Sequence, residues 1–180
     1  MDRSVPRIGS WAGWLALVGI ALYLLLVLVT YQQSDPGWSH SVRTDSVRNA
    51  GGMVGAYIAD LMLYLFGVSA YWWIVLCGAL VAWGFRRIEN LEPGDRRSYA
   101  VVLTGFVILL LASSGIETVR LHSVHAALPF APGGVMGAIV GQGIAKGFGF
   151  TGGTLVLLLA FAAGLSLFSG MSAARARAPR

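Results

Sequence analysis

The sequence predicts an all-α integral membrane protein with four transmembrane helices, arranged as two similar hairpins that each carry a short Gly-rich helix on the outer side. Its composition is 56% hydrophobic and 12% charged, and its mean hydropathy is +0.70, whereas soluble domains contain about 25% charged residues. One apolar run, between Arg48 and Arg86, is too long for a single span, and part of it recurs later in the chain. These three observations indicate a bilayer as the solvent.

The first predicted span covers residues 11–31, and Arg3 and Arg7 lie on its amino side. Its length is sufficient, because about 20 apolar residues cross a bilayer as a helix. The run exceeds the apolar region of a signal peptide and lacks a small-residue cleavage site. We therefore expect a membrane anchor.

The second hydrophobic run, residues 49–85, contains 37 residues and a single charge, Asp60. As one helix it would measure roughly 55 Å, against about 30 Å of hydrocarbon. Gly67 marks a bend before an aromatic cluster. The run therefore predicts a short outer helix at about 51–66, followed by a span at about 67–85.

The second half of the chain shows the same order of elements. Residues 99–116 predict a third span, residues 133–148 a second short outer helix, and residues 152–171 a fourth span. The membrane domain is expected to cover 1–174, and 175–180 would begin a cytoplasmic linker. Whether the outer helices are re-entrant or interfacial stays open.

Basic residues indicate the orientation. Nine of the thirteen fall before the first span, between the second and third, or after the fourth: Arg3, Arg7, Arg86, Arg87, Arg96, Arg97, Arg175, Arg177 and Arg180. The other four, Arg43, Arg48, Arg120 and Lys146, fall on the opposite side. Cytoplasmic loops carry the excess of Lys and Arg. Both termini are therefore predicted to be cytoplasmic.

An internal repeat appears when Gly51 is set against Gly133, an offset of 82 residues. Six positions are then identical over 17 residues, including three leading glycines and a closing Phe-Gly. Each copy follows an outward span and precedes an inward one, so the repeat predicts two hairpins of the same sense. The alternative is two independently acquired re-entrant or interfacial segments, because Gly-rich segments match by composition.

Small residues at four-residue spacing form a stripe in each copy: Gly51, Gly55 and Ala59 in the first, and Gly133, Gly137, Gly141 and Ala145 in the second. Such stripes let helix backbones approach closely in a membrane. They are our candidates for helix packing or oligomerisation, with a partner either in the same chain or in another subunit. A flexible Gly-rich loop is the alternative.

Asp60 and Lys146 are the charged residues of the two repeated segments. If the two short helices pack together, these charges can pair, which offsets the cost of keeping each from water. In the alternative, Lys146 extends to the surface and Asp60 accepts hydrogen bonds from a loop.

No catalytic, cofactor-binding or metal-ligating residue is predicted. Lys146 is followed by glycine, so it lacks the Gly-Lys-Ser/Thr ending of a phosphate-binding loop. His122 and His125 lack the further ligands of a zinc site, and Cys77 has no cysteine to pair with. The sequence itself leaves two classes open, an anchoring and assembly domain or a free-standing small channel or transporter of four spans.

Several motifs resemble the amino-terminal membrane domain of the FtsK/SpoIIIE family of septal DNA translocases. They are Thr30-Tyr31, Ser34-Asp35-Pro36-Gly37-Trp38, the segment 49–71 and Gly133-Gly134 with Gly137. The resemblance covers nearly the whole chain. It implies four spans in the bacterial inner membrane and both termini in the cytoplasm. It also implies a hexamer that anchors a motor at the division septum and contacts other cell-division proteins.

The family's linker, ATPase motor and DNA-reading domain do not occur in this sequence. We therefore expect a membrane-anchoring and oligomerising part of a longer protein, with no enzymatic activity of its own. ATP, magnesium and DNA would be bound by the missing motor, in a parent that couples chromosome segregation to cell division.

Overall fold

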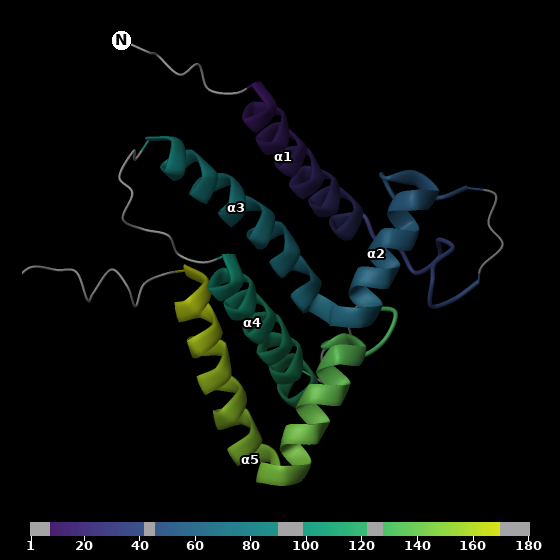
Figure 1. The fold of residues 1–180 in the computed structure, drawn as a ribbon. Helices are drawn as coiled ribbons and strands as arrows, with labels where there is room; N and C mark the ends of the chain where they lie inside the picture. The colour runs from purple at the N-terminus through teal and green to yellow at the C-terminus, as the bar shows by residue number, and fades with distance from the viewer. Residues whose placement is uncertain (1–7, 42–45, 90–98, 122–127, 170–180) are drawn as a thin grey trace, which may run out of the picture.

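The computed structural model describes residues 8–41, 46–89, 99–121 and 128–169, and the regular secondary structure within them is entirely helical, as predicted. The elements are α1 (Ile8–Val29), α2 (Gly52–Phe66), the 3-10 helix η1 (Gly67–Tyr71), α3 (Trp72–Glu89), α4 (Tyr99–Arg120) and α5 (Gly134–Ser169) (Figure 1). α1 begins before residue 11, and α4 continues beyond residue 116. The residues expected as a fourth span join the second short helix in α5, which is interrupted at Gly149.

Two bent units, which we call the first V and the second V, dominate the arrangement (Figure 1). In the first V, α2 meets α3 at η1, and in the second V the two arms of α5, 134–148 and 150–169, meet at Gly149. Four glycines have positive φ: Gly52 (65°), Gly67 (60°), Gly134 (63°) and Gly149 (71°). They form two pairs separated by the 82 residues of the sequence repeat. The two copies therefore share the backbone conformation at which each V starts and bends.

α1 and α4 each pack against the bent unit that follows them in the chain. Both helices are described over 22 residues. A side chain at Gly55 would lie 2.8 Å from Val27 Cγ1, and one at Gly137 would meet Thr118 Oγ1 at 2.5 Å. Each short helix thus uses its small residues to approach the preceding long helix.

α4 and the second arm of α5 approach backbone to backbone. A Cβ added at Gly105 would lie 2.6 Å from the amide nitrogen of Phe168, and one at Gly164 would lie 2.6 Å from that of Leu109. Small residues permit such contacts between membrane helices, where apolar side chains gain little over lipid. An aromatic chain completes the contact between the two halves: Phe66, Trp73, Phe106 and Phe168 follow one another at 5.2 to 5.9 Å between ring centroids.

Three helical stretches of the described chain are long and apolar enough to cross a membrane: 52–82, 100–120 and 134–169. A shorter apolar stretch, 13–29, lies in α1. Large apolar side chains such as Leu15, Leu22 and Leu159 are exposed on these helices. Since water penalises such surfaces, the outside of the helices suits lipid.

Candidate functional site

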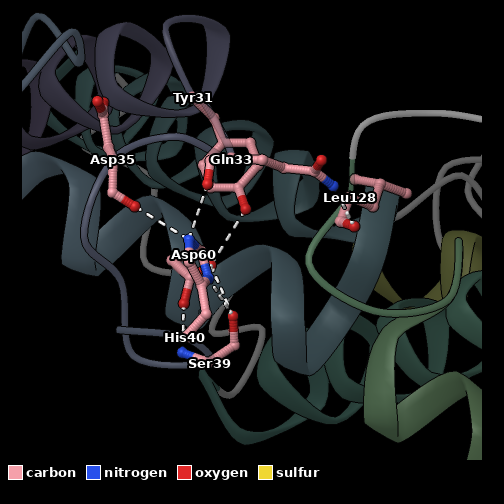
Figure 2. A network of polar contacts seen from close by, with 7 residues as sticks. All are labelled: Tyr31, Gln33, Asp35, Ser39, His40, Asp60 and Leu128. Carbon is pink, nitrogen blue, oxygen red and sulfur yellow. Dashed lines mark hydrogen bonds and ion pairs between the residues drawn. The ribbon is translucent and has the colours of Figure 1, made fainter. Parts of the chain in front are cut away.

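The Asp60 carboxylate is the centre of a polar network between α2 and the loop that follows α1 (Figure 2). Its side chain is 1% exposed. Oδ2 accepts a hydrogen bond from the Ser39 amide (2.6 Å), and Oδ1 accepts from the Ser39 hydroxyl (3.0 Å) and the Tyr31 hydroxyl (3.1 Å). A phenol keeps its proton at neutral pH, so Tyr31 is a donor in this network.

His40 joins this network to the turn before it (Figure 2). Its Nδ1 lies 3.6 Å from Asp60 Oδ1, and its Nε2 lies 2.9 Å from the Gln33 carbonyl and 3.0 Å from the Asp35 carbonyl. Carbonyl oxygens only accept, so Nε2 carries a proton and donates. The imidazole is thereby fixed in orientation over the carboxylate.

Asp35 and Asn49 form hydrogen bonds that hold the part of the same loop just before α2. The buried Asp35 carboxylate accepts hydrogen bonds from the backbone amides of Arg48 (2.9 Å) and Asn49 (2.7 Å). The Asn49 side chain donates to the Val27 carbonyl at 2.8 Å, at the end of α1. Buried polar groups with satisfied partners specify one conformation, so the described parts of this loop are held against both α1 and α2.

In its described part, the loop exposes one large apolar side chain. Trp38 is 69% exposed, although its neighbour Gly37 packs so closely on Asp60 that a Cβ would lie 2.6 Å from Asp60 Cγ. Only glycine fits at that position. The carboxylate network therefore sets where Trp38 is displayed.

A second polar cluster lies where the two Vs meet. The buried Glu117 carboxylate of α4 accepts hydrogen bonds from the Ser69 hydroxyl (2.6 Å) and the Ser69 amide (3.2 Å) of η1. The Ser113 hydroxyl, one turn earlier in α4, lies 2.7 Å from the Ser69 hydroxyl oxygen and accepts a hydrogen bond from Trp72 Nε1 (3.2 Å). A charged group thus fixes the bend of the first V to the long helix of the second half.

The backbones of the two Vs also touch directly. Gly67 contacts the Pro132 carbonyl so closely that no side chain could be added there. The Val68 amide donates a hydrogen bond to that carbonyl at 2.9 Å. The loops make a further contact, since Gln33 Nε2 donates to the Leu128 carbonyl at 2.8 Å (Figure 2).

The predicted small-residue stripes lie against helices of the same chain. Gly51 and Gly55 contact α1, and Ala59 is fully buried in the core beside them. In the second copy Gly133, Gly137 and Gly141 contact α4, and the backbone of Ala145 lies 3.2 Å from a Cβ added at Gly153. These positions pack the monomer, so their occupied faces are not free for a second subunit.

The structure does not bring Asp60 and Lys146 together as an ion pair. Asp60 is surrounded by Tyr31, Ser39 and His40, while Lys146 is exposed on the first arm of α5. This arrangement corresponds to the alternative in which a loop satisfies the carboxylate. The role of Glu117 was not predicted, although Ser113 and Glu117 stand one turn apart in an otherwise apolar helix, a pattern that could have indicated a shared polar partner.

Residues 7–178 match the family described as the 4TM region of DNA translocase FtsK/SpoIIIE. The chain is 45% identical over 170 residues to DNA translocase FtsK 2 of Ralstonia nicotianae, which covers 90% of this chain and 22% of that protein. It is 36% identical to DNA translocase FtsK of Shewanella oneidensis, over 85% of this chain and 16% of the relative.

A third relative, DNA translocase FtsK 1 of Neisseria meningitidis serogroup A, is 32% identical over 95% of this chain and 21% of its own length. No solved structure matches the chain. The chain spans about a fifth of the length of these curated relatives, and the part it matches is the membrane region. The chain therefore belongs to the family of FtsK/SpoIIIE 4TM regions, the membrane-anchoring part of a DNA translocase.

Proposed function

We propose that this chain anchors and oligomerises a DNA translocase at the bacterial division septum, so that chromosome segregation is coupled to cell division. The match of residues 7–178 to the 4TM region carries the proposal. The long apolar helices support the anchoring role, because they suit a bilayer and expose apolar side chains outward. The sequence resemblance to a family of hexameric septal proteins supports the oligomer and the location.

The proposed topology has four spans, α1, α3, α4 and the second arm of α5, with both termini in the cytoplasm. The distribution of arginine residues supports this orientation. α2 and the first arm of α5 then lie on the periplasmic side, together with the loop that displays Trp38. That loop offers other septal proteins an ordered surface, since Asp35 and Asp60 hold its shape.

The motor activity belongs to the rest of such a protein. In this proposal ATP, magnesium and DNA bind to a motor domain that follows the membrane region, and this chain supplies attachment and assembly. A free-standing channel or transporter has less support, because Ser69, Ser113 and Glu117 bond to one another at the junction instead of lining a polar path.

Localisation in dividing cells tests the proposal. The chain is fused at its carboxyl end to a fluorescent protein and produced at low level, beside an unrelated four-span protein with the same label as a control. We expect enrichment of the chain at the constriction site and an even distribution of the control. An even distribution of both would contradict the septal role.

A further inference from the structure

The junction inside the chain joins the end of one repeat to the beginning of the other. We call residues 65–68 and 147–150 the first and second tips, and residues 50–54 and 132–136 the first and second shoulders. These segments correspond at the 82-residue offset. The first tip rests on the second shoulder: a Cβ at Gly134 would lie 2.6 Å from the Gly67 amide nitrogen, and Val68 donates to Pro132.

The second tip also bends at a glycine with positive φ, but no described segment packs on that glycine as the second shoulder packs on Gly67. Gly149 has φ 71°, close to the 60° of Gly67, yet no described atom lies within 4 Å of a Cβ added to it. On either side of it, Phe148 is 65% exposed and Phe150 is 52% exposed. The Arg120 guanidinium lies 4.5 Å from the centroid of the Phe150 ring. Phe148 and about half of Phe150 are thus exposed beside a bend whose counterpart glycine, Gly67, is buried.

Like the second tip, the first shoulder has no described segment packed on its glycine. No described atom lies within 4 Å of a Cβ added at Gly52, the counterpart of Gly134. Met53 is 58% exposed and Val54 is 66% exposed, whereas their counterparts in the second shoulder are partly buried. In the part of the chain that the structure describes, no hydrogen bond reaches the Ala50 carbonyl, the counterpart of the Pro132 acceptor.

From this pattern we infer that the second tip of one chain docks on the first shoulder of another copy, which repeats the internal junction between subunits. Within the described residues, the second tip and the first shoulder are apolar, and each lacks the partner segment that its counterpart has. Gly149 and Phe150 then take the places of Gly67 and Val68, and the Ala50 carbonyl accepts from the Phe150 amide. The inference deepens the oligomerising part of the proposed function and rests on it.

Such an interface is heterologous, because two different patches meet. Heterologous contacts continue from subunit to subunit and close into a ring or form an open chain. In the proposed topology both hairpins have the same sense, so repeating the junction keeps every subunit upright in one membrane. The small-residue stripes are not needed for it, which agrees with their use inside the monomer.

One pair of side chains differs in charge between the two junctions. Inside the chain, the Tyr64 and Phe130 rings pack edge to face at 5.6 Å. Their counterparts at the proposed interface are Lys146 and Arg48, two cations. Their repulsion weakens the association, so Lys146→Glu should convert it into an attraction and raise the yield of assembled chains about two- to fivefold. Lys146→Gln, which only removes the charge, is the matched control and should give a smaller rise.

Disulfide cross-linking in native membranes tests the contact itself. All variants carry Cys77→Ala, and two differently tagged chains are produced together, one with Ala50→Cys and the other with Phe150→Cys. We expect a product that contains one chain of each kind. Because a disulfide requires Cα atoms within about 7 Å, Ala50→Cys with Ile139→Cys serves as an exposed control pair and should give none. Val68→Cys with Pro132→Cys in one chain shows that the internal junction is linkable.

Three other outcomes would overturn the inference, and each identifies a different alternative. Products from either single variant alone would indicate a symmetric contact between identical patches. A native mass above one chain without the mixed product would leave the oligomerising function standing and show that tip and shoulder face lipid or another partner. A native mass of one chain, in detergent and in lipid nanodiscs, would overturn both the interface and the oligomerising function.

Discussion

At the scale of single residues, buried carboxylates organise the parts of the chain that lack regular structure. Asp60 and Asp35 each accept hydrogen bonds from loop residues, and Glu117 accepts them from Ser69 in η1. A buried charge is tolerated only when hydrogen bonds replace water. These acids therefore fix where loops and bends lie, and each should respond to substitution through its own partners.

The effect of an Asp60 substitution on the free energy of unfolding should depend on whether Ser39 is present and should not depend on Lys146. Removing a partner of a buried charge costs about 1–3 kcal/mol, so Asp60→Asn and Ser39→Ala should each destabilise the chain and show a coupling of roughly 1 kcal/mol in a double-mutant cycle. Thermal unfolding in detergent measures it.

The matched cycle combines Asp60→Asn with Lys146→Met. Here the two effects should add within about 0.5 kcal/mol, because the side chains share no partner. Coupling of Asp60 to Lys146 as large as that to Ser39 would contradict the loop network.

At the scale of elements, left-handed glycines decide where each V bends. Gly67 and Gly149 have similar φ, but a Cβ added at Gly67 would clash with the Pro132 carbonyl, whereas one added at Gly149 would meet no described atom within 4 Å. The two positions therefore separate the cost of the backbone conformation from the cost of lost packing.

Gly149→Ala should destabilise the monomer by about 1–3 kcal/mol, because φ 71° with ψ 179° lies in a region that is almost restricted to glycine. Gly67→Ala carries the same penalty and also forces the two Vs apart, which adds about 1–3 kcal/mol. Unfolding of the two variants in detergent gives the difference directly. Equal losses would show that the junction between the Vs contributes nothing.

Glu117 should stabilise the fold through its hydrogen bonds to Ser69 in η1. Glu117→Ala leaves the Ser69 amide without its acceptor, whereas the Ser69 hydroxyl retains Ser113 Oγ at 2.7 Å, so we expect a loss of about 1–3 kcal/mol. Glu117→Gln keeps an acceptor oxygen and should lose less. Hydrogen exchange at residues 67–71 should accelerate in the alanine variant, and unchanged exchange there would show that the carboxylate does not hold the bend.

Hydropathy and glycine spacing were sufficient to predict the helices, because bilayer thickness limits span length and glycine allows the bend at residue 67. The continuation of α4 to Arg120 was missed, since Glu117 interrupts the apolar run and its partners come from η1. The Asp60 contacts could not be predicted either. Ser39 and His40 lie in a loop without periodicity, so sequence spacing gave no sign that they approach α2.

At the scale of the whole molecule, the described parts of the two halves of the chain place their helices in a similar order. Each half contains a 22-residue helix, then a short helix whose small residues face that long helix, and then a long apolar helical arm. The first tip meets the second shoulder inside the chain, and the remaining tip and shoulder stay exposed. We propose that both copies cross the membrane in the same direction, which returns the chain to the cytoplasm twice.

Cysteine labelling in intact spheroplasts tests that topology most directly. In a Cys77→Ala background, single cysteines at Ser4, Ser41, Gln142 and Ser172 are exposed to a membrane-impermeant reagent, before and after permeabilisation. We predict labelling of Ser41→Cys and Gln142→Cys from outside, and of Ser4→Cys and Ser172→Cys only after permeabilisation. Outside labelling at residue 4 or 172, or protection at residue 41 or 142, would contradict a four-span anchor with two hairpins of the same sense.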